Sequence, residues 1–132
     1  MQNNKEIVLE WIKRADNDEL NIVSILKHKD GEPSLTCFLS QQMAEKYLKA
    51  LLIFYENNYP RIHSLIKLLT LISKYSPDIL KEIEEEIILI EPYYIETRYS
   101  EDILAESFSW EMAEKAYESA KRIKNLVLEK LK

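Results

Sequence analysis

The sequence is short of glycine and cysteine, and these two shortages exclude several kinds of site. Gly31 is the only glycine among 132 residues, whereas Walker-type phosphate loops and dinucleotide-binding loops need several glycines in a short window. Both loops are therefore excluded, and tight β-hairpins that need glycine at positive φ are disfavoured. The single cysteine, Cys37, provides neither an intrachain disulfide nor a cysteine-rich zinc site. Because Cys37 lies in an apolar stretch, we expect a buried, unreactive thiol.

The chain also lacks a basic excess and a long apolar run. Its net charge is −5, from 23 acidic and 18 basic side chains, which disfavours generic coating of nucleic acid but leaves room for a local basic face. The first ten residues are polar and charged, unlike a signal peptide. No apolar run approaches the length needed to span a bilayer. We therefore expect a soluble, cytoplasmic protein without membrane contacts.

Helical periodicity runs along the whole chain. The predicted helices cover residues 5–28, 34–57, 64–74, 78–91 and 110–131, and the segment 92–107 is expected to be irregular. Gly31 and Pro33 separate the first two helices, and Ser109 is expected to cap the last one. We find no internal repeat and no linker. The sequence thus predicts a single all-α domain over residues 1–132, folded as an antiparallel bundle of four to five helices.

The predicted helix 34–57 is apolar on two sides. One face carries Ser40, Gln41, Ala44, Tyr47, Leu48, Leu51 and Tyr55, and the opposite face carries Leu35, Phe38, Leu39, Ala50 and Ile53. A surface helix of a monomer should be polar on one side, so the second face should meet another helix or another subunit. We predict a homodimer on this basis, with this helix near the interface.

Residues suited to catalysis are few. The two histidines, His28 and His63, form no metal-ligand pair at helical spacing, and no His-Glu-x-x-His or Cys-x-x-Cys motif occurs. Ser, His and Asp residues do not form the pattern of a nucleophile elbow. We therefore expect neither a metal nor a cofactor.

The most specific spacing lies within residues 41–50. Gln42, Lys46 and Lys49 are at positions i, i+4 and i+7, which places an amide and two ammonium groups on one helical face. Glu45 and Lys49 are spaced for a favourable ion pair. Two interpretations fit this pattern: a solvated face whose charges pair with one another, or a surface that faces phosphate.

Several motifs, taken in their order and spacing, resemble the HEPN superfamily (the higher eukaryotes and prokaryotes nucleotide-binding domain). They are residues 11–18, Gln-Gln-x-Ala-Glu-Lys-x-Leu-Lys-Ala at 41–50, His63-Ser64-Leu65, Arg98-Tyr99 and the alanine-lined last helix. The resemblance spans nearly the whole chain. It implies an all-α bundle of four to five helices, usually a homodimer.

Within this superfamily, one motif separates the ribonuclease members from the others. Ribonuclease members carry an Arg followed after four to six residues by a His, near the dimer interface, which implies metal-independent RNA cleavage. Arg98 matches the Arg, but residues 103–105 are Ile, Leu and Ala where the His should follow. We therefore assign no catalytic residue, and Arg98 is the only candidate if the chain is a nuclease. His63 has two interpretations, a substitute acid–base group or a structural or helix-capping residue.

Members without that motif are typically encoded beside a minimal nucleotidyltransferase. The resemblance then implies a non-catalytic subunit that binds a nucleotide or this partner enzyme, as in toxin–antitoxin modules. The candidate nucleotide-binding residues are Lys46, Lys49, Arg98 and Tyr99. Two further functions fit the sequence: a divergent metal-independent ribonuclease that acts on RNA as a toxin, or a dimeric adaptor that binds only protein.

Arg98 and the neighbouring tyrosines each have two interpretations. Arg98 either pairs with the acidic residues at 96, 101 and 102 or faces a phosphate. In some toxin–antitoxin members the partner enzyme modifies a Tyr near the Arg, and Tyr99 is the corresponding candidate. Packing with surface hydroxyls is the other interpretation for Tyr93, Tyr94 and Tyr99.

Overall fold

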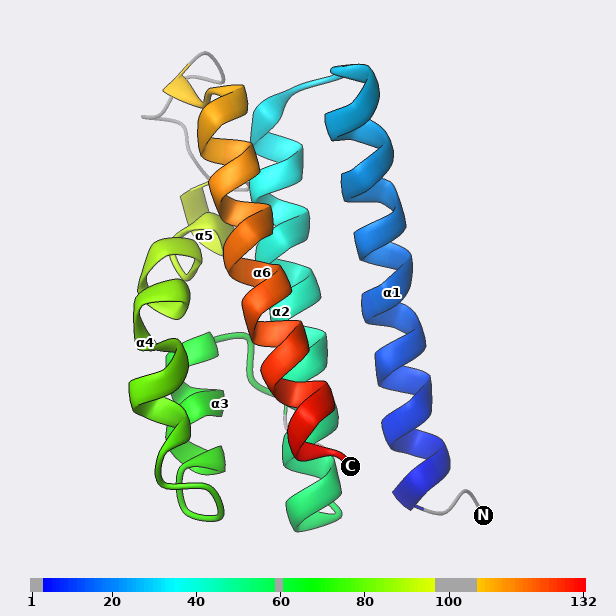
Figure 1. Cartoon of the computed structure of the whole chain (residues 1–132), viewed down its shortest axis with the longest axis vertical. Coiled ribbons are helices and arrows are strands. Elements are labelled where there is room, and N and C mark those ends of the chain that lie inside the picture. The colour runs from blue at the N-terminus through cyan, green and yellow to red at the C-terminus, as the bar shows by residue number, and fades with distance from the viewer. Residues whose placement is uncertain (1–3, 59–60, 97–106) are drawn as a thin grey trace.

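The computed structural model describes residues 4–58, 61–96 and 107–132, and most of them are helical. The helices are α1 (Asn4–His28), α2 (Pro33–Glu56), α3 (Leu65–Ile72), α4 (Ile79–Ile90), the one-turn α5 (Tyr93–Glu96) and α6 (Trp110–Lys130) (Figure 1). Five of them have eight or more residues, and the described residues contain no strand. The predicted all-α bundle is therefore confirmed. Within these residues no helix combines the length and the apolar character needed to cross a membrane.

The helices begin and end within a few residues of the predicted positions. Ser109 caps α6 as expected, since its hydroxyl accepts a hydrogen bond from the Met112 amide at 3.1 Å. Gly31 lies between α1 and α2 with φ of 77°, a left-handed conformation that glycine adopts without strain. Pro33 is the first residue of α2, where its missing N–H costs no helical hydrogen bond. The expected irregular segment contains α5, and its residues 97–106 lie outside the described residues.

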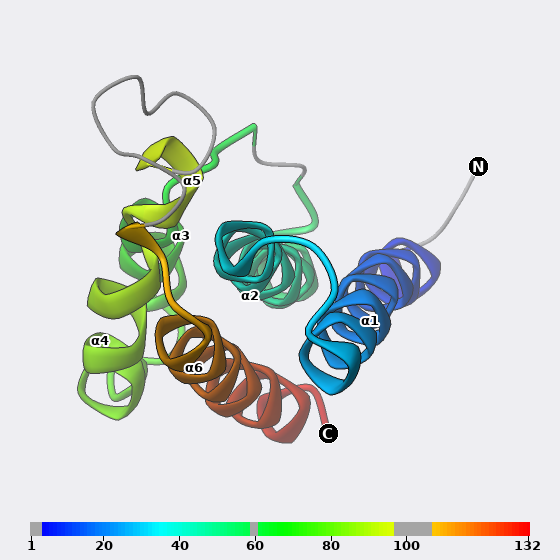
Figure 2. The same cartoon turned by 90° about the horizontal axis from the view of Figure 1, so that it is seen from above.

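Helix α2 is the centre of the molecule. Seen from above, it lies between α1 on one side and α6 and α3 on the other (Figure 2). Fourteen of its 24 residues are buried, in accordance with this position. The three alanines predicted to allow close packing of the last helix, Ala113, Ala116 and Ala120, are fully buried in the main core.

Part of the second apolar face of α2, Ala50 and Ile53, meets α1 of the same chain. Of the other residues of this face, Phe38 lies beside Tyr94 of α5, Leu39 packs against the main core and Leu35 is exposed. Ala50 and Ile53 pack with Val8 and Trp11 in a small apolar cluster that is separate from the main core. Of the two partners expected for this face, another helix is thus the one that the structure supplies. The homodimer stays a prediction, because the apolar pattern of α2 no longer requires a second subunit to explain it.

Acidic residues that interrupt the apolar stripe of α1 form polar contacts with α2 and α6. The Tyr47 hydroxyl donates a hydrogen bond to Asp16. Glu19 accepts hydrogen bonds from the Tyr117 hydroxyl at 2.8 Å and from Lys124 Nζ at 2.5 Å. Burial raises the pKa of both tyrosines, and the hydrogen bonds to carboxylates raise it further. These contacts hold α1 against the rest of the bundle.

Cys37 is fully buried in α2, as expected from its apolar neighbours. Burial raises the pKa of its thiol to about 12, because the thiolate would lose its hydration in the core. The thiol therefore stays protonated, and hence unreactive, in the folded protein at neutral pH.

The long helices run in alternating directions along most of the chain. Figure 1 shows α1 antiparallel to α2, and α4 antiparallel to both α3 and α6, whereas α2 and α6 run in the same direction. The start of α1 and the end of α6 therefore lie at one end of the bundle. Helix α5 lies toward the other end, near the start of α6.

Candidate functional site

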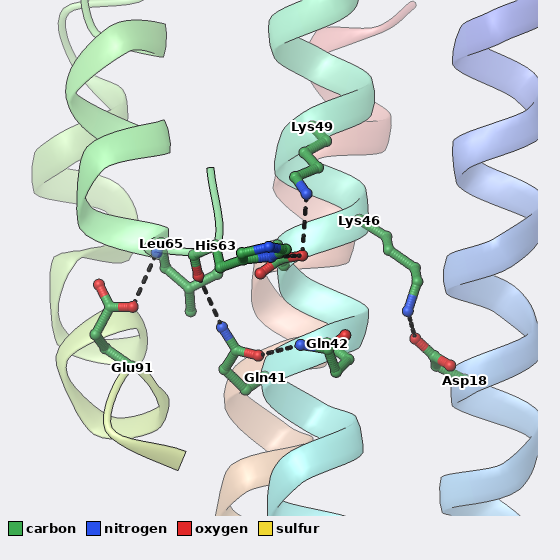
Figure 3. Close-up of polar contacts among 9 residues, drawn as sticks. Asp18, Gln41, Gln42, Lys46, Lys49, His63, Leu65 and Glu91 are labelled. Carbon is green, nitrogen blue, oxygen red and sulfur yellow. Dashed lines mark hydrogen bonds and ion pairs between the residues drawn. The ribbon is translucent and has the colours of Figure 1, made fainter. Parts of the chain in front are cut away.

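A buried carboxylate near the middle of α2 is the centre of the most organised polar site. Glu45 Oε2 accepts a hydrogen bond from Lys49 Nζ at 3.1 Å and lies 3.4 Å from His63 Nδ1. Dashed lines in Figure 3 mark both contacts at Lys49 and His63. The other oxygen, Oε1, is buried and has no hydrogen-bond partner among the described residues. We call Glu45, Lys49, His63 and Tyr94 the Glu45 cluster.

The ion pair in this cluster is withdrawn from water. The side chains of Lys49 and Glu45 are only 5% and 4% exposed, and the Lys49 ammonium lies 5.3 Å from the centre of the Trp11 ring of α1. The predicted i,i+4 pair is thus confirmed, in a buried setting. Moving two charges out of water is costly unless they stay paired, so Lys49 and Glu45 depend on each other.

His63 brings an exposed imidazole to this pair from the segment before α3. Its backbone carbonyl accepts a hydrogen bond from Gln41 Nε2 at 3.2 Å, which fixes the segment against α2 (Figure 3). Its ring stacks on Tyr94 of α5, with centroids 5.3 Å apart and planes at 8°. The His63 side chain is 58% exposed. A carboxylate beside Nδ1 favours the tautomer that carries the proton there, which leaves Nε2 as the acceptor.

Glu91, at the end of α4, anchors the beginning of α3. Its carboxylate accepts hydrogen bonds from the amides of Leu65 and Ile66 at 2.9 and 2.8 Å and from the Ser64 hydroxyl at 3.1 Å. Figure 3 shows Glu91 directed toward Leu65. A carboxylate at a helix N-terminus satisfies amides that have no partner within the helix and complements the helix dipole. The segment carrying His63 is thereby attached to the helix that leads into α5.

The aromatic part of the site continues beyond His63. Tyr94 is half-buried, and its ring also lies 6.4 Å from that of Phe38, at 31°. Two of the predicted site residues, Arg98 and Tyr99, follow α5 by two and three positions in the sequence and lie outside the described residues. Tyr93, the other tyrosine of α5, is buried against Phe108 in the main core, which agrees with the packing interpretation.

The three polar residues expected on one face of α2 have separate partners. Lys46 Nζ donates to Asp18 of α1 at 2.6 Å, and Lys49 pairs with Glu45. The Gln42 amide donates to Gln41 Oε1 at 2.8 Å. Figure 3 shows Lys46 directed toward α1, away from His63. In the absence of a ligand, both ammonium groups are therefore neutralised within the chain, as the ion-pairing interpretation describes.

His63 and Glu45 are brought together by contacts that helical periodicity does not reveal. Glu45 is polar but occupies a buried position of α2, and a charged residue on a core-facing stripe was the one signal available in the sequence. Glu91 and Tyr94 lie on chain segments far from α2 in the sequence, and no pattern in the sequence indicated that they would contribute to the site. In the part of the chain that is described, no three or more His, Cys, Asp or Glu side chains converge as a metal site requires.

Comparisons with known proteins place the chain in a family. A family model for the HEPN domain matches residues 8–131. The crystal structure of TT1696 from Thermus thermophilus is similar with a TM-score of 0.82 and 27% identity, covering 93% of this chain and 97% of that one. The crystal structure of ST0689, an archaeal HEPN homologue, is similar with a TM-score of 0.75 and 28% identity over 100% of both chains. The search of curated proteins finds no match. Because the family model covers nearly all of the sequence, the chain belongs to the HEPN domain family.

Proposed function

We propose that this chain is a non-catalytic binding subunit that holds a nucleotide at the Glu45 cluster and works with a minimal nucleotidyltransferase. The observation that carries the proposal is the parallel stack of His63 on Tyr94, in which the His63 side chain is largely exposed beside a buried ion pair. Such a stack can be extended by one more flat ring. Base–aromatic stacking contributes about 1–3 kcal/mol per base.

The polar residues around the stack suit the rest of a nucleotide. Arg98 would contact the phosphates, because its guanidinium presents several donors to one anionic group, with Tyr99 beside it. Lys46 and Lys49 would contribute only if a phosphate replaced Asp18 or Glu45 as their partner, since both are paired in the structure. The single glycine agrees with this arrangement, because side chains rather than a glycine loop would bind the phosphates.

The proposal also includes assembly. The family resemblance implies a homodimer and a nucleotidyltransferase encoded in the neighbouring reading frame. Light scattering of the purified chain at micromolar concentration tests the first part, and a strict monomer would contradict it. Co-expression with the neighbouring nucleotidyltransferase tests the second part, with a stable complex on size exclusion as the expected result.

Calorimetric titration with ATP tests the nucleotide site directly. We expect binding that weakens at least tenfold in both His63→Ala and Arg98→Ala, because each variant removes a different part of the contact. Tyr75→Phe is the matched control, since this tyrosine stacks on Tyr55 elsewhere on the molecule and donates to Glu56. Absence of binding heat, or equal affinity in His63→Ala and the unaltered chain, would instead favour the adaptor that binds only protein.

One observation favours a second candidate, a metal-independent ribonuclease. With Glu45 beside Nδ1 of His63, Nε2 is free to accept the proton of an RNA 2′-hydroxyl. The binding proposal expects no cleavage when the chain is incubated with single-stranded and structured RNA in EDTA. Cleavage that is lost in both His63→Ala and Arg98→Ala would replace the proposal with this second function.

A further inference from the structure

An apolar groove of about 500 Å³ lies at the end of the bundle where α1 begins and α6 ends. We call it the α1–α6 groove. Its apolar lining comes from Val8, Leu9 and Ile12 of α1, Phe54 of α2, Leu128 of α6 and Leu131, which caps the end of α6. The groove shares no lining residue with the Glu45 cluster, and Figure 1 shows this end of the bundle far from α5, which carries Tyr94.

Two large apolar side chains of the groove are exposed. Leu9 is 55% exposed and Phe54 is 44% exposed. A single exposed apolar residue is ordinary on a protein surface, whereas apolar side chains gathered in a concave site mark a place where another molecule is buried. Because α1 and α6 flank this groove, the position left open between them suits another helix, as in helix-in-groove recognition.

The charges at the groove indicate the sign of the charge expected on the molecule that binds there. Lys5 and Lys132 both line it and are exposed, and neither forms an ion pair with a described residue. Charge complementarity therefore calls for acidic residues beside the apolar stripe of the occupant.

Asn4 adds a polar contact point. Its Nδ2 donates to the Phe54 carbonyl near the end of α2 at 3.4 Å. Its Oδ1 is buried and lacks a hydrogen-bond donor among the described residues, and Asn4 lines the groove. A buried acceptor without a donor is unfavourable.

We infer that the α1–α6 groove binds an amphipathic helix of a partner protein, with an apolar stripe flanked by Glu or Asp. Leu9 and Phe54 are buried on its apolar side, while Lys5 and Lys132 pair with its carboxylates. The contact leaves the Glu45 cluster accessible, so helix and nucleotide can be bound together. This inference does not depend on the proposed function.

Fluorescence anisotropy with designed peptides tests the inference. The probe is a labelled 18-residue helical peptide with a leucine stripe flanked by glutamates, compared with a scrambled peptide and with one that has lysines in place of the glutamates. We expect the glutamate peptide to bind at least tenfold more tightly than either. Leu9→Glu should weaken its binding at least tenfold, whereas Leu20→Glu, at a 69% exposed position of α1 outside the groove, should not change it.

A charge-reversal variant gives a second test, because an unfolded variant would lose binding to both peptides rather than reverse its preference. The double variant Lys5→Glu, Lys132→Glu should prefer the lysine peptide to the glutamate peptide. Equal binding of scrambled and designed peptides, or an unchanged preference in the double variant, would overturn the inference. So would light scattering in which Leu9→Glu converts a dimer into a monomer, because the occupant would then be a second copy of this chain.

Discussion

The Lys49 ammonium has two neighbours, the Glu45 carboxylate and the Trp11 ring, and almost no contact with water. At the scale of single residues this makes Lys49 unlike the other lysines of the chain, most of which keep part of their side chain in solvent. A charge in such a place is tolerated because its partner is close: removing Glu45 leaves Lys49 desolvated and unpaired, and removing Lys49 leaves Glu45 with only its contact to His63. The difference in stability between removing one member of the pair and removing both can be measured.

Lys49→Met should destabilise the fold by about 3 kcal/mol, because it leaves the buried Glu45 carboxylate without its ammonium partner. The double variant Glu45→Leu, Lys49→Met should be less destabilised than Lys49→Met alone, since it removes both charges. Urea unfolding followed by circular dichroism measures both. The control is Lys115→Met, in an exposed i,i+4 pair with Glu111, for which we expect a change within about 0.5 kcal/mol. A double variant less stable than the single one would contradict this account of the pair.

Cys37 gives a prediction for the dependence of stability on pH. Burial raises the pKa of its thiol from the ordinary value of 9.0 to about 12, so the unfolded chain loses this proton between those values while the folded chain keeps it. Unfolding then releases a proton, and stability falls as the pH rises from 9 toward 12, by about 1.4 kcal/mol per pH unit. Below pH 9 the contribution is constant.

The measurement compares urea unfolding of the unaltered chain and of Cys37→Ala between pH 8 and 10.5. The raised pKa values of Tyr47 and Tyr117 act in the same direction in both proteins, so the difference in slope isolates the thiol. The unaltered chain should show the steeper loss above pH 9. Parallel curves, or rapid reaction of the native thiol with a disulfide reagent at pH 8, would show that Cys37 is accessible to water.

At the scale of elements, α3 is notable because its first turn depends on another helix. Eight residues are too few to form a stable isolated helix, and Glu91 of α4 supplies the acceptors for its first amides. The short helix and the His63 segment before it are thus held by a carboxylate 26 residues further along the chain than Leu65.

Glu91→Ala should destabilise the protein by about 1–2 kcal/mol, the usual effect of losing a helix N-cap. The Leu65 and Ile66 amides should lose their protection from hydrogen exchange in this variant while the amides of α2 keep theirs. Glu85→Ala, an exposed position of the same helix, is the control and should leave these amides unchanged. Equal protection of Leu65 in both variants would refute the anchoring role of Glu91.

The elements themselves were largely predictable from local signals. Apolar periodicity located the five longer helices, and the Ser109 hydroxyl before Trp110 marked the start of α6. The partner of an apolar face is not a local property. The two-sided pattern of α2 was the same whether α1 or a second subunit covered it, and for that reason the sequence could not decide between them.

At the scale of the whole molecule, α2 connects two apolar clusters. Trp11 belongs to the small cluster between α1 and α2, and Trp110 packs against the main core. Helix α2 contributes Ala50 and Ile53 to the small cluster and many other residues to the main core. Neither cluster can therefore come apart without disturbing α2. We expect the chain to unfold as one cooperative unit.

The two tryptophans allow this expectation to be tested. Trp110→Phe leaves Trp11 as the only indole, and Trp11→Phe leaves Trp110. In each variant the urea midpoint from tryptophan fluorescence should coincide with that from circular dichroism at 222 nm. An earlier fluorescence transition in Trp110→Phe alone would mean that α1 detaches from a core that stays folded.

The candidate site was predictable in part, and its least predictable members are those that the whole fold brings together. The pairing of Lys49 with Glu45 followed from spacing along one helix, whereas Lys46, predicted from the same spacing, pairs with Asp18 of α1 instead. The approach of His63 to Glu45 and its stacking on Tyr94 require α2, the segment before α3, and α5 to be positioned at once. Such contacts depend on tertiary packing, which a single sequence does not encode in any short window.

The central position of α2 has a consequence for how this protein can change in evolution or in the laboratory. Gln41, Glu45 and Lys49 belong to the site and to the buried interior of the same helix. Under the proposed function, a substitution that changes nucleotide binding at these positions also alters stability, so they offer few independent routes to a new specificity. His63 and Tyr94 come from outside α2 and are more exposed. We therefore expect libraries randomised at these two rim positions to yield many more folded variants with altered ligand preference than libraries randomised along α2.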